Sequence, residues 1–172
     1  TFLPNGIVDM DVKLTPKTKE LYRAGLVCAV NAGLENVDYY AYGPWENYID
    51  RKDGCMIGRY STTVDDMVER YVKPQSMGNR ESLRELKLTG KDGCGIRIET
   101  EGAVAFSALR YTDADLMNAR HMWELQKRPY IVLHLDAQMR GLGNGSCGPV
   151  TLESYKIAPM PFSYKLRISY ID

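Results

Sequence analysis

The stretch Gly43-Pro44-Trp45-Glu46-Asn47-Tyr48-Ile49-Asp50-Arg51 organises the rest of the chain. It follows a predicted strand, which the Gly-Pro pair ends. Arg51 can form paired hydrogen bonds with Glu46 or Asp50, and Asn47 can bond backbone groups. The residues alone favour a rigid corner between strands, and a sugar-binding pocket is the alternative that stays open.

Patterns typical of β-strands lie on both sides of this stretch. Apolar and polar residues alternate over residues 8–14 and 162–170, which indicates strands buried on one face. Residues 22–30 are apolar on both faces, as expected for an inner strand, and residues 130–137 form a buried run. Further strands are expected at 37–42, 57–60, 83–88, 96–98 and 104–108. The patterns predict an all-β domain.

One short helix interrupts the strands, and it is expected at residues 113–119. Thr112 can cap its first turn, where acidic residues are favoured by the helix dipole. Residues 61–80 and 141–149 lack a regular period and are predicted to be loops, and loops of this length often contact ligands or partners. We find no internal repeat or linker, so the sequence predicts a single domain over residues 1–172.

The composition bounds the partners of this domain. A chain of 172 residues can bury a core of its own. Lys and Arg together number 22, as do Asp and Glu, so the formal net charge is zero and no nucleic-acid partner is expected. The apolar runs are too short to cross a bilayer, and no membrane partner is expected either. The compartment stays open.

Four cysteines, at positions 28, 55, 94 and 147, lie far apart. The chain has no Cys-x-x-Cys motif, and its two histidines lack the spacing of metal ligands. We therefore expect free thiols and no metal site, although the even count leaves a disulfide open.

The opening stretch resembles the Gly-Pro-x-Glu-Asn-Tyr-x-Asp-Arg segment in the C-terminal domain of large bacterial β-galactosidases of glycoside hydrolase family 2. Four further stretches resemble the family in the same order: Tyr71-Val72-Lys73-Pro74-Gln75 with Gly78-Asn79-Arg80, residues 106–111, residues 133–136, and Gly141-Leu142-Gly143 with Ser146-Cys147-Gly148-Pro149. The resemblance covers nearly the whole chain. It implies a large antiparallel β-sandwich related to the aldose mutarotases, with one short helix, and a start at Thr1 that falls inside that domain.

The resemblance also implies the activity, which is hydrolysis of terminal β-galactosides. A glycosidase uses two carboxyl groups, and Glu46 and Asp50 are the obvious pair in this chain. Arg51 would lower the pKa of both, whereas a general acid needs a raised one. In the family, the catalytic acid and nucleophile lie in a preceding (β/α) barrel. We therefore expect no catalytic residue and no cofactor here, and an inactive isolated segment; Mg and Na would be needs of the full-length enzyme.

The glycine-rich loop carries the candidate substrate contacts. The family has a Trp after a Ser there, and its indole stacks on the sugar at the entrance of the site. In this chain Ser146 is followed by Cys147, and Asn144-Gly145 stands where well-known members carry paired aspartates. Asn144, Ser146 and Cys147 are thus predicted to meet the galactoside at the interface with the barrel. Without the indole, we expect a larger or differently linked galactoside to be preferred.

Structural roles are expected for the other residues that match the family, which are Glu46, Asn47, Tyr48, Asp50, Arg51, Arg80 and His121. Unpaired sheet edges also predict association into homo-oligomers.

Two alternatives stay open. A mutarotase-like epimerase would use His121, His134 and Glu46 for proton transfer. A non-catalytic carbohydrate-binding module would expose Trp45, Trp123 and Tyr42.

Overall fold

The computed structural model of the chain describes residues 1–18, 20–145 and 147–172. Within them, eight strands form one antiparallel sheet. They are β1 (Val8–Leu14), β2 (Arg23–Asn31), β3 (Asn36–Gly43), β4 (Met56–Thr63), β5 (Arg80–Thr89), β6 (Gly95–Leu109), β7 (Tyr130–Met139) and β8 (Phe162–Ile171). One α-helix, α1 (Asp113–Asn118), and two short 3-10 turns complete the described elements. The predicted all-β fold class is confirmed.

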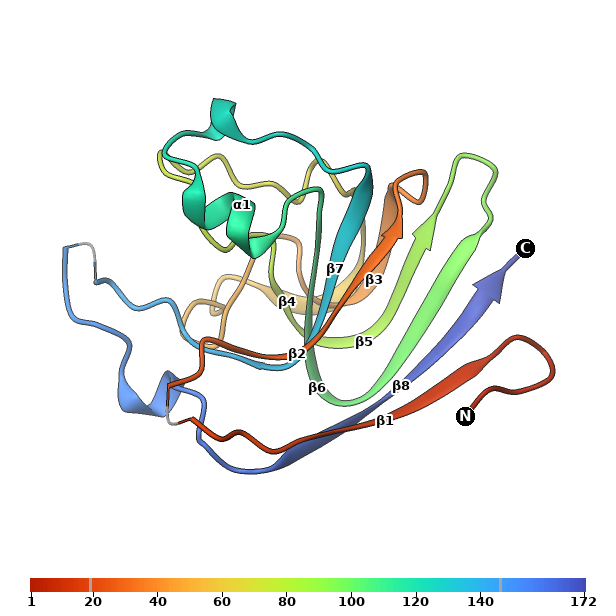
Figure 1. Cartoon of the computed structure of the whole chain (residues 1–172), viewed down its shortest axis with the longest axis horizontal. Helices are drawn as coiled ribbons and strands as arrows, with labels where there is room; N and C mark the ends of the chain where they lie inside the picture. The colour runs from red at the N-terminus through yellow and green to blue at the C-terminus, as the bar shows by residue number, and fades with distance from the viewer. Residues whose placement is uncertain (19, 146) are drawn as a thin grey trace.

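The sheet branches at the long strand β6. Its first half, up to Glu101, pairs with β8, and its second half, from Ala105, pairs with β7. Between the two halves lies Gly102, whose φ of +103° is a conformation that residues with a side chain rarely adopt. Figure 1 shows β6 running down beside β5 and β8, turning, and rising again beside β7. The turn folds the sheet over on itself, which is consistent with the expected sandwich.

The strand order follows from this branching. One path runs β1-β8-β6-β5-β3-β4, and the other leaves β6 through β7 to β2. The apolar faces enclose a core that includes Val37, Tyr39, Leu86, Leu88, Ile98, Phe106, Leu133, Leu135 and Leu166. The loop between β4 and β5 closes one end of this core with Val64, Met67 and Met77. This loop is therefore packed against the sheet along part of its length.

The helix α1 begins as its sequence predicts. Thr112 accepts a hydrogen bond from the backbone of Asp115, whose carboxylate in turn accepts one from the backbone of Thr112. Leu116 anchors the helix in the core. Within the described part of the chain, no helix is long and apolar enough to cross a membrane.

The structure corrects the prediction for residues 22–30. They form β2, which pairs only with β7 among the described strands and therefore lies at a sheet edge. Val27 and Cys28 are exposed there. The apolar run gave a wrong prediction because nothing in the described chain covers the outer side of this strand. Cys28, Cys55 and Cys94 are free thiols, as expected.

Candidate functional site

Glu46 is the centre of the corner between β3 and β4. Its carboxylate pairs with Arg51 and accepts a hydrogen bond from the hydroxyl of Tyr71. The backbone N–H of Gly78 donates to it at 3.0 Å, and the hydroxyl of Tyr48 at 3.3 Å. The side chain is only 5% exposed. Four donors therefore surround this carboxylate, which leaves it poorly placed to hand a proton to a substrate.

The two tyrosines beside Glu46 are held in their neutral form. Tyr48 is completely buried, and burial raises its pKa well above the usual value, with the charge of Glu46 adding to the effect. Burial and the hydrogen bond to Glu46 also raise the pKa of Tyr71. Both hydroxyls remain hydrogen-bond donors over the whole physiological pH range.

Asn47 joins the corner to the start of β5. Its side-chain nitrogen donates to the carbonyls of Tyr42 (3.2 Å) and Trp45 (2.9 Å), and its side-chain oxygen accepts from the backbone of Glu81 at 2.8 Å. Asn79 donates back to the carbonyl of Asn47 at 2.8 Å. All of Asn47 is buried, so these bonds replace the water that it would otherwise bind.

Arg80 begins β5 next to this junction. Its Nε lies 3.3 Å from the hydroxyl of Tyr39, and one terminal nitrogen donates to the carbonyl of Asn79 at 3.1 Å. The side chain is almost completely buried. The contacts of Arg80 hold the two strands β3 and β5 together.

Asp50 binds the glycine-rich loop and not Arg51. Its carboxylate accepts hydrogen bonds from the backbone N–H groups of Leu142 (3.0 Å) and Gly143 (2.8 Å). Gly143 has a φ of +63°, and a β-carbon there would lie 2.5 Å from the backbone nitrogen of Thr151. The hydroxyl of Thr151 closes the loop with a bond to the carbonyl of Gly141 at 2.9 Å. The corner therefore fixes the base of the loop.

The tip of the loop carries the predicted substrate contacts. Asn144 is exposed, and its backbone accepts hydrogen bonds from the N–H groups of Cys147 (3.0 Å) and Gly148 (2.6 Å). Cys147 is exposed as well. Ser146 lies outside the described residues. Asn144 and Cys147 thus lie at the surface, on a loop whose base is fixed by Asp50.

Sequence reasoning missed a group of charged residues where β2 meets β7. Arg23 Nη1 donates to both carboxylate oxygens of Asp113, at 3.1 and 3.3 Å. Its Nε lies 3.0 Å from an oxygen of Asp136, without the alignment of a hydrogen bond. His134 Nε2 lies 3.7 Å from Asp113. These four residues are called the Arg23 cluster below. In the sequence, this cluster is indicated only by the i, i+2 spacing of His134 and Asp136, which places both residues on one face of a strand.

Burial shifts the pKa values of Asp136 and His134, two members of the Arg23 cluster, in opposite directions. Asp136 is 1% exposed, and desolvation raises its pKa to about 7 although Arg23 lies close. Desolvation, followed by the charge of Arg23, lowers the pKa of His134 to about 4. Near neutral pH the histidine is therefore neutral, and Asp136 keeps its proton to a higher pH than an exposed aspartate does.

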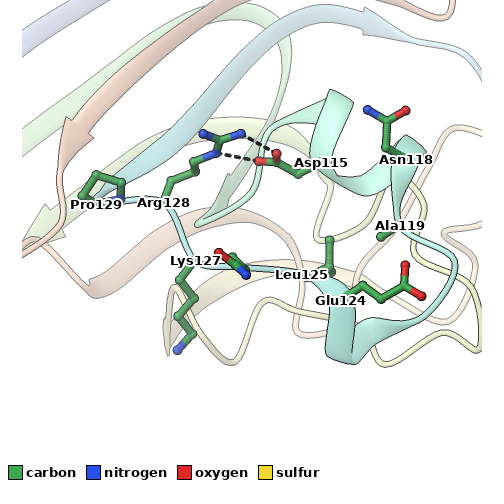
Figure 2. Close-up of a pocket in the computed structure, with 9 residues that line it drawn as sticks. Asp115, Asn118, Ala119, Glu124, Leu125, Lys127, Arg128 and Pro129 are labelled. Atoms are coloured by element: carbon green, nitrogen blue, oxygen red, sulfur yellow. Dashed lines mark hydrogen bonds and ion pairs between the residues drawn. The ribbon is translucent and has the colours of Figure 1, made fainter.

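A hollow of about 480 Å³ lies between α1 and the segment that follows it (Figure 2). Arg128 binds Asp115 there through two nitrogens, at 2.6 and 2.9 Å. This pair, with Arg128 as the main cause, holds the pKa of Asp115 well below its usual value. No predicted site residue lines the hollow. Asp115 and Arg128 anchor the helix to the strand that follows.

His121, His134 and Glu46 are held by three separate sets of partners. The ring of His121 stacks on Trp123, with 4.1 Å between ring centroids, while His134 belongs to the Arg23 cluster. Nothing in the described structure brings the three residues together as an epimerase would need. Trp45 and Trp123 are exposed and lie on different connections of the fold. The described residues also contain no group of three or more potential metal-ligating side chains.

The family model and the relatives found by comparison with known proteins agree on one family. A family model described as β-galactosidase small chain matches residues 1–168. A β-galactosidase of Actinobacillus pleuropneumoniae is 29% identical over 169 residues, which are 97% of this chain and 16% of that protein. One from Vibrio cholerae is 33% identical over 162 residues, or 94% and 15%. One from Streptococcus thermophilus is 34% identical over 120 residues, or 69% and 12%. The chain thus spans about a sixth of the length of these relatives, or less.

Proposed function

The chain belongs to the β-galactosidase small-chain family, and we propose that it is a non-catalytic segment of a β-galactosidase that hydrolyses terminal β-galactosides. The glycine-rich loop shapes the mouth of an active site whose catalytic carboxylates lie in a (β/α) barrel of the same polypeptide. The galactoside binds where the loop faces that barrel. The observation that carries this proposal is the pair of hydrogen bonds from the loop to Asp50.

The two carboxylates of the corner support a role in shaping the site. Glu46 is surrounded by Arg51, Tyr71, Tyr48 and the backbone of Gly78. Asp50 is occupied by two backbone N–H groups. A glycosidase needs one carboxyl group that protonates the leaving group and one that attacks or activates water. Neither carboxylate is placed to do so.

We propose that any metal ions the enzyme needs are held by parts of the polypeptide outside this segment. Mg and Na are the ions that the family resemblance suggests. The described residues of this chain offer no set of three ligating side chains for them. No step of the reaction is assigned to a metal held by this segment.

Hydrolysis of p-nitrophenyl β-galactoside, measured with the full-length polypeptide and with residues 1–172 alone, tests the proposal. We expect turnover by the former and none by the latter. Turnover by residues 1–172 alone would show that a catalytic group lies in this chain. A full-length polypeptide without activity would overturn the proposal. Polarimetry of galactose mutarotation on the same samples checks the epimerase alternative, for which we expect no signal.

We also propose that the segment contributes to homo-oligomer formation. The strands β1, β2 and β4 each lie at an end of the described sheet paths, and unpaired strand edges favour pairing with another chain. Val27 and Met56 expose apolar surface on two of these strands. Light scattering over a wide concentration range tests this proposal, and a constant monomer mass would contradict it.

A further inference from the structure

Two hollows meet along the base of the glycine-rich loop. The first, of about 230 Å³, is lined by loop residues that include Gly141 and Gly145. The second, of about 620 Å³, extends from there towards Arg23 and Asp113. Tyr22, Ser76 and Met139 line both hollows. The two hollows therefore adjoin at these residues, and together they are called the Tyr22 groove below.

Tyr22 offers a flat surface in the middle of this groove. The residue is 69% exposed. The guanidinium of Arg140 lies 5.0 Å from the ring centroid, in a cation–π contact that favours one orientation of the ring. A fixed and exposed aromatic ring is the usual platform on which the apolar face of a pyranose packs. Tyr22 is thus preorganised for contact with a sugar.

The far end of the groove places a donor beside an acceptor. Arg23 Nη2 has only the Met139 sulfur as a described partner, at 3.5 Å, and a thioether is a weak acceptor. The carboxylate of Asp113 binds Arg23 yet remains 52% exposed. Two neighbouring hydroxyls of a sugar ring present the same combination of donor and acceptor. This end of the groove therefore suits a diol.

The groove offers charged groups of both signs, since Arg23, Arg140 and Lys73 are cationic and Asp113 is anionic. The charge of Arg23 is balanced by Asp113. Lys73 and Gln75 also line the groove and are exposed, and neither has a hydrogen bond or ion pair within the described part of the chain. They supply further donors and an acceptor for the hydroxyls of a polyol.

We propose that the Tyr22 groove binds a further sugar unit of a β-galactosyl oligosaccharide, on the leaving-group side of the bond that is cleaved. This proposal rests on the proposed function, since it places the groove next to the loop at the mouth of the active site. It also names the substrate class, namely galactosides of three or more sugar units. The ring of Tyr22 packs on this unit, and Arg23 and Asp113 bind its hydroxyls.

The test compares Tyr22→Ala with Tyr170→Ala in the full-length enzyme. Tyr170 is similarly exposed, lies on β8 and lines neither hollow. The measured quantity is kcat/KM for β-1,4-galactotriose divided by kcat/KM for p-nitrophenyl β-galactoside. We expect Tyr22→Ala to lower this ratio about fivefold, the usual effect of a lost stacking contact. Tyr170→Ala should leave the ratio unchanged.

Two results would overturn the proposal. One is an unchanged ratio in Tyr22→Ala. The other is a ratio that falls equally in Tyr22→Ala and Tyr170→Ala, which would show that the effect does not depend on the groove. β-1,3- and β-1,6-linked galactotrioses, run in parallel, identify the linkage that the groove prefers.

A binding experiment separates this proposal from the proposed function. Calorimetry with a non-hydrolysable, sulfur-linked β-galactotriose needs no turnover. In a full-length enzyme without galactosidase activity the proposed function fails, and the groove is still supported if Tyr22→Ala weakens binding about fivefold and Tyr170→Ala does not. Absence of binding to the parent enzyme would refute the groove in either case.

Discussion

The substitution Asp50→Asn tests whether the corner controls the glycine-rich loop. The carboxylate of Asp50 accepts from the N–H groups of Leu142 and Gly143 at 3.0 and 2.8 Å. A hydrogen bond to a charged group contributes about 1.5–3 kcal/mol. The amide of asparagine keeps one neutral acceptor and loses the other. We therefore expect the substitution to destabilise the closed form of the loop by about 2 kcal/mol relative to the open form. This corresponds to a roughly 30-fold higher population of the open form.

Hydrogen exchange measures this loss directly. The amides of Leu142 and Gly143 should exchange about 30-fold faster in Asp50→Asn than in the parent protein, provided that exchange proceeds through opening of the loop. Asp53→Asn is the matched control, because it removes the same charge from an exposed position in the same connection. In the full-length enzyme, kcat/KM for p-nitrophenyl β-galactoside should fall with Asp50→Asn alone.

Equal exchange rates in the two variants would refute this reasoning. The loop would then be held by Thr151 and its own backbone bonds, and Asp50 would have no role in the site. Faster exchange throughout the protein would instead indicate general unfolding, and the unfolding temperature of each variant distinguishes the two cases.

Three further predictions concern stability and substrate choice. Asn47→Ala should lower the free energy of unfolding by about 2–4 kcal/mol, because it leaves buried partners of Asn47 unsatisfied; urea denaturation against the exposed control Asn5→Ala measures the difference. Asp136→Asn should make the free energy of unfolding fall more steeply as the pH is lowered from about 7 to about 4.5. In that range Asp136, with its pKa raised to about 7, takes up a proton on folding and favours the folded state as the pH falls, whereas His134, with its pKa lowered to about 4, does the opposite. Parallel pH profiles for variant and parent would contradict this assignment. Cys147→Trp in the full-length enzyme should raise kcat/KM for lactose severalfold relative to an aryl galactoside, because an indole at this exposed position can stack on the sugar; an unchanged ratio would refute a substrate contact at position 147.

The sequence predicted those parts of the corner that depend on residues close together in the chain. Glu46 and Arg51 are five positions apart, so a turn brings them within reach of each other whatever the rest of the fold does. The same is true of the Thr112 cap on α1. Asp50 differs, because its partners lie 92 and 93 positions away. Only the folded sheet brings that loop to the corner.

Strand β6 shows a second limit of the sequence patterns. Residues 96–98 and 104–108 read as two strands, because the exposed residues around Gly102 interrupt the alternation. In the structure they are one strand that changes neighbours at this glycine, from β8 to β7. A local pattern reports which side chains are buried. It does not report whether the backbone continues its pairing through an exposed bend.

The Arg23 cluster depends on an irregularity that no side-chain pattern encodes. The pairing of β2 with β7 shifts between Ala24 and Gly25, and this bulge changes the alignment of Arg23 relative to Asp136. The approach is close enough that a β-carbon on Gly25 would lie 2.4 Å from the Asp136 backbone. Since Arg23 also reaches Asp113 at the wall of the Tyr22 groove, the same bulge determines where the polar end of the groove lies. A change at Gly25 should therefore alter oligosaccharide preference through the position of Arg23, even though Gly25 lines neither hollow.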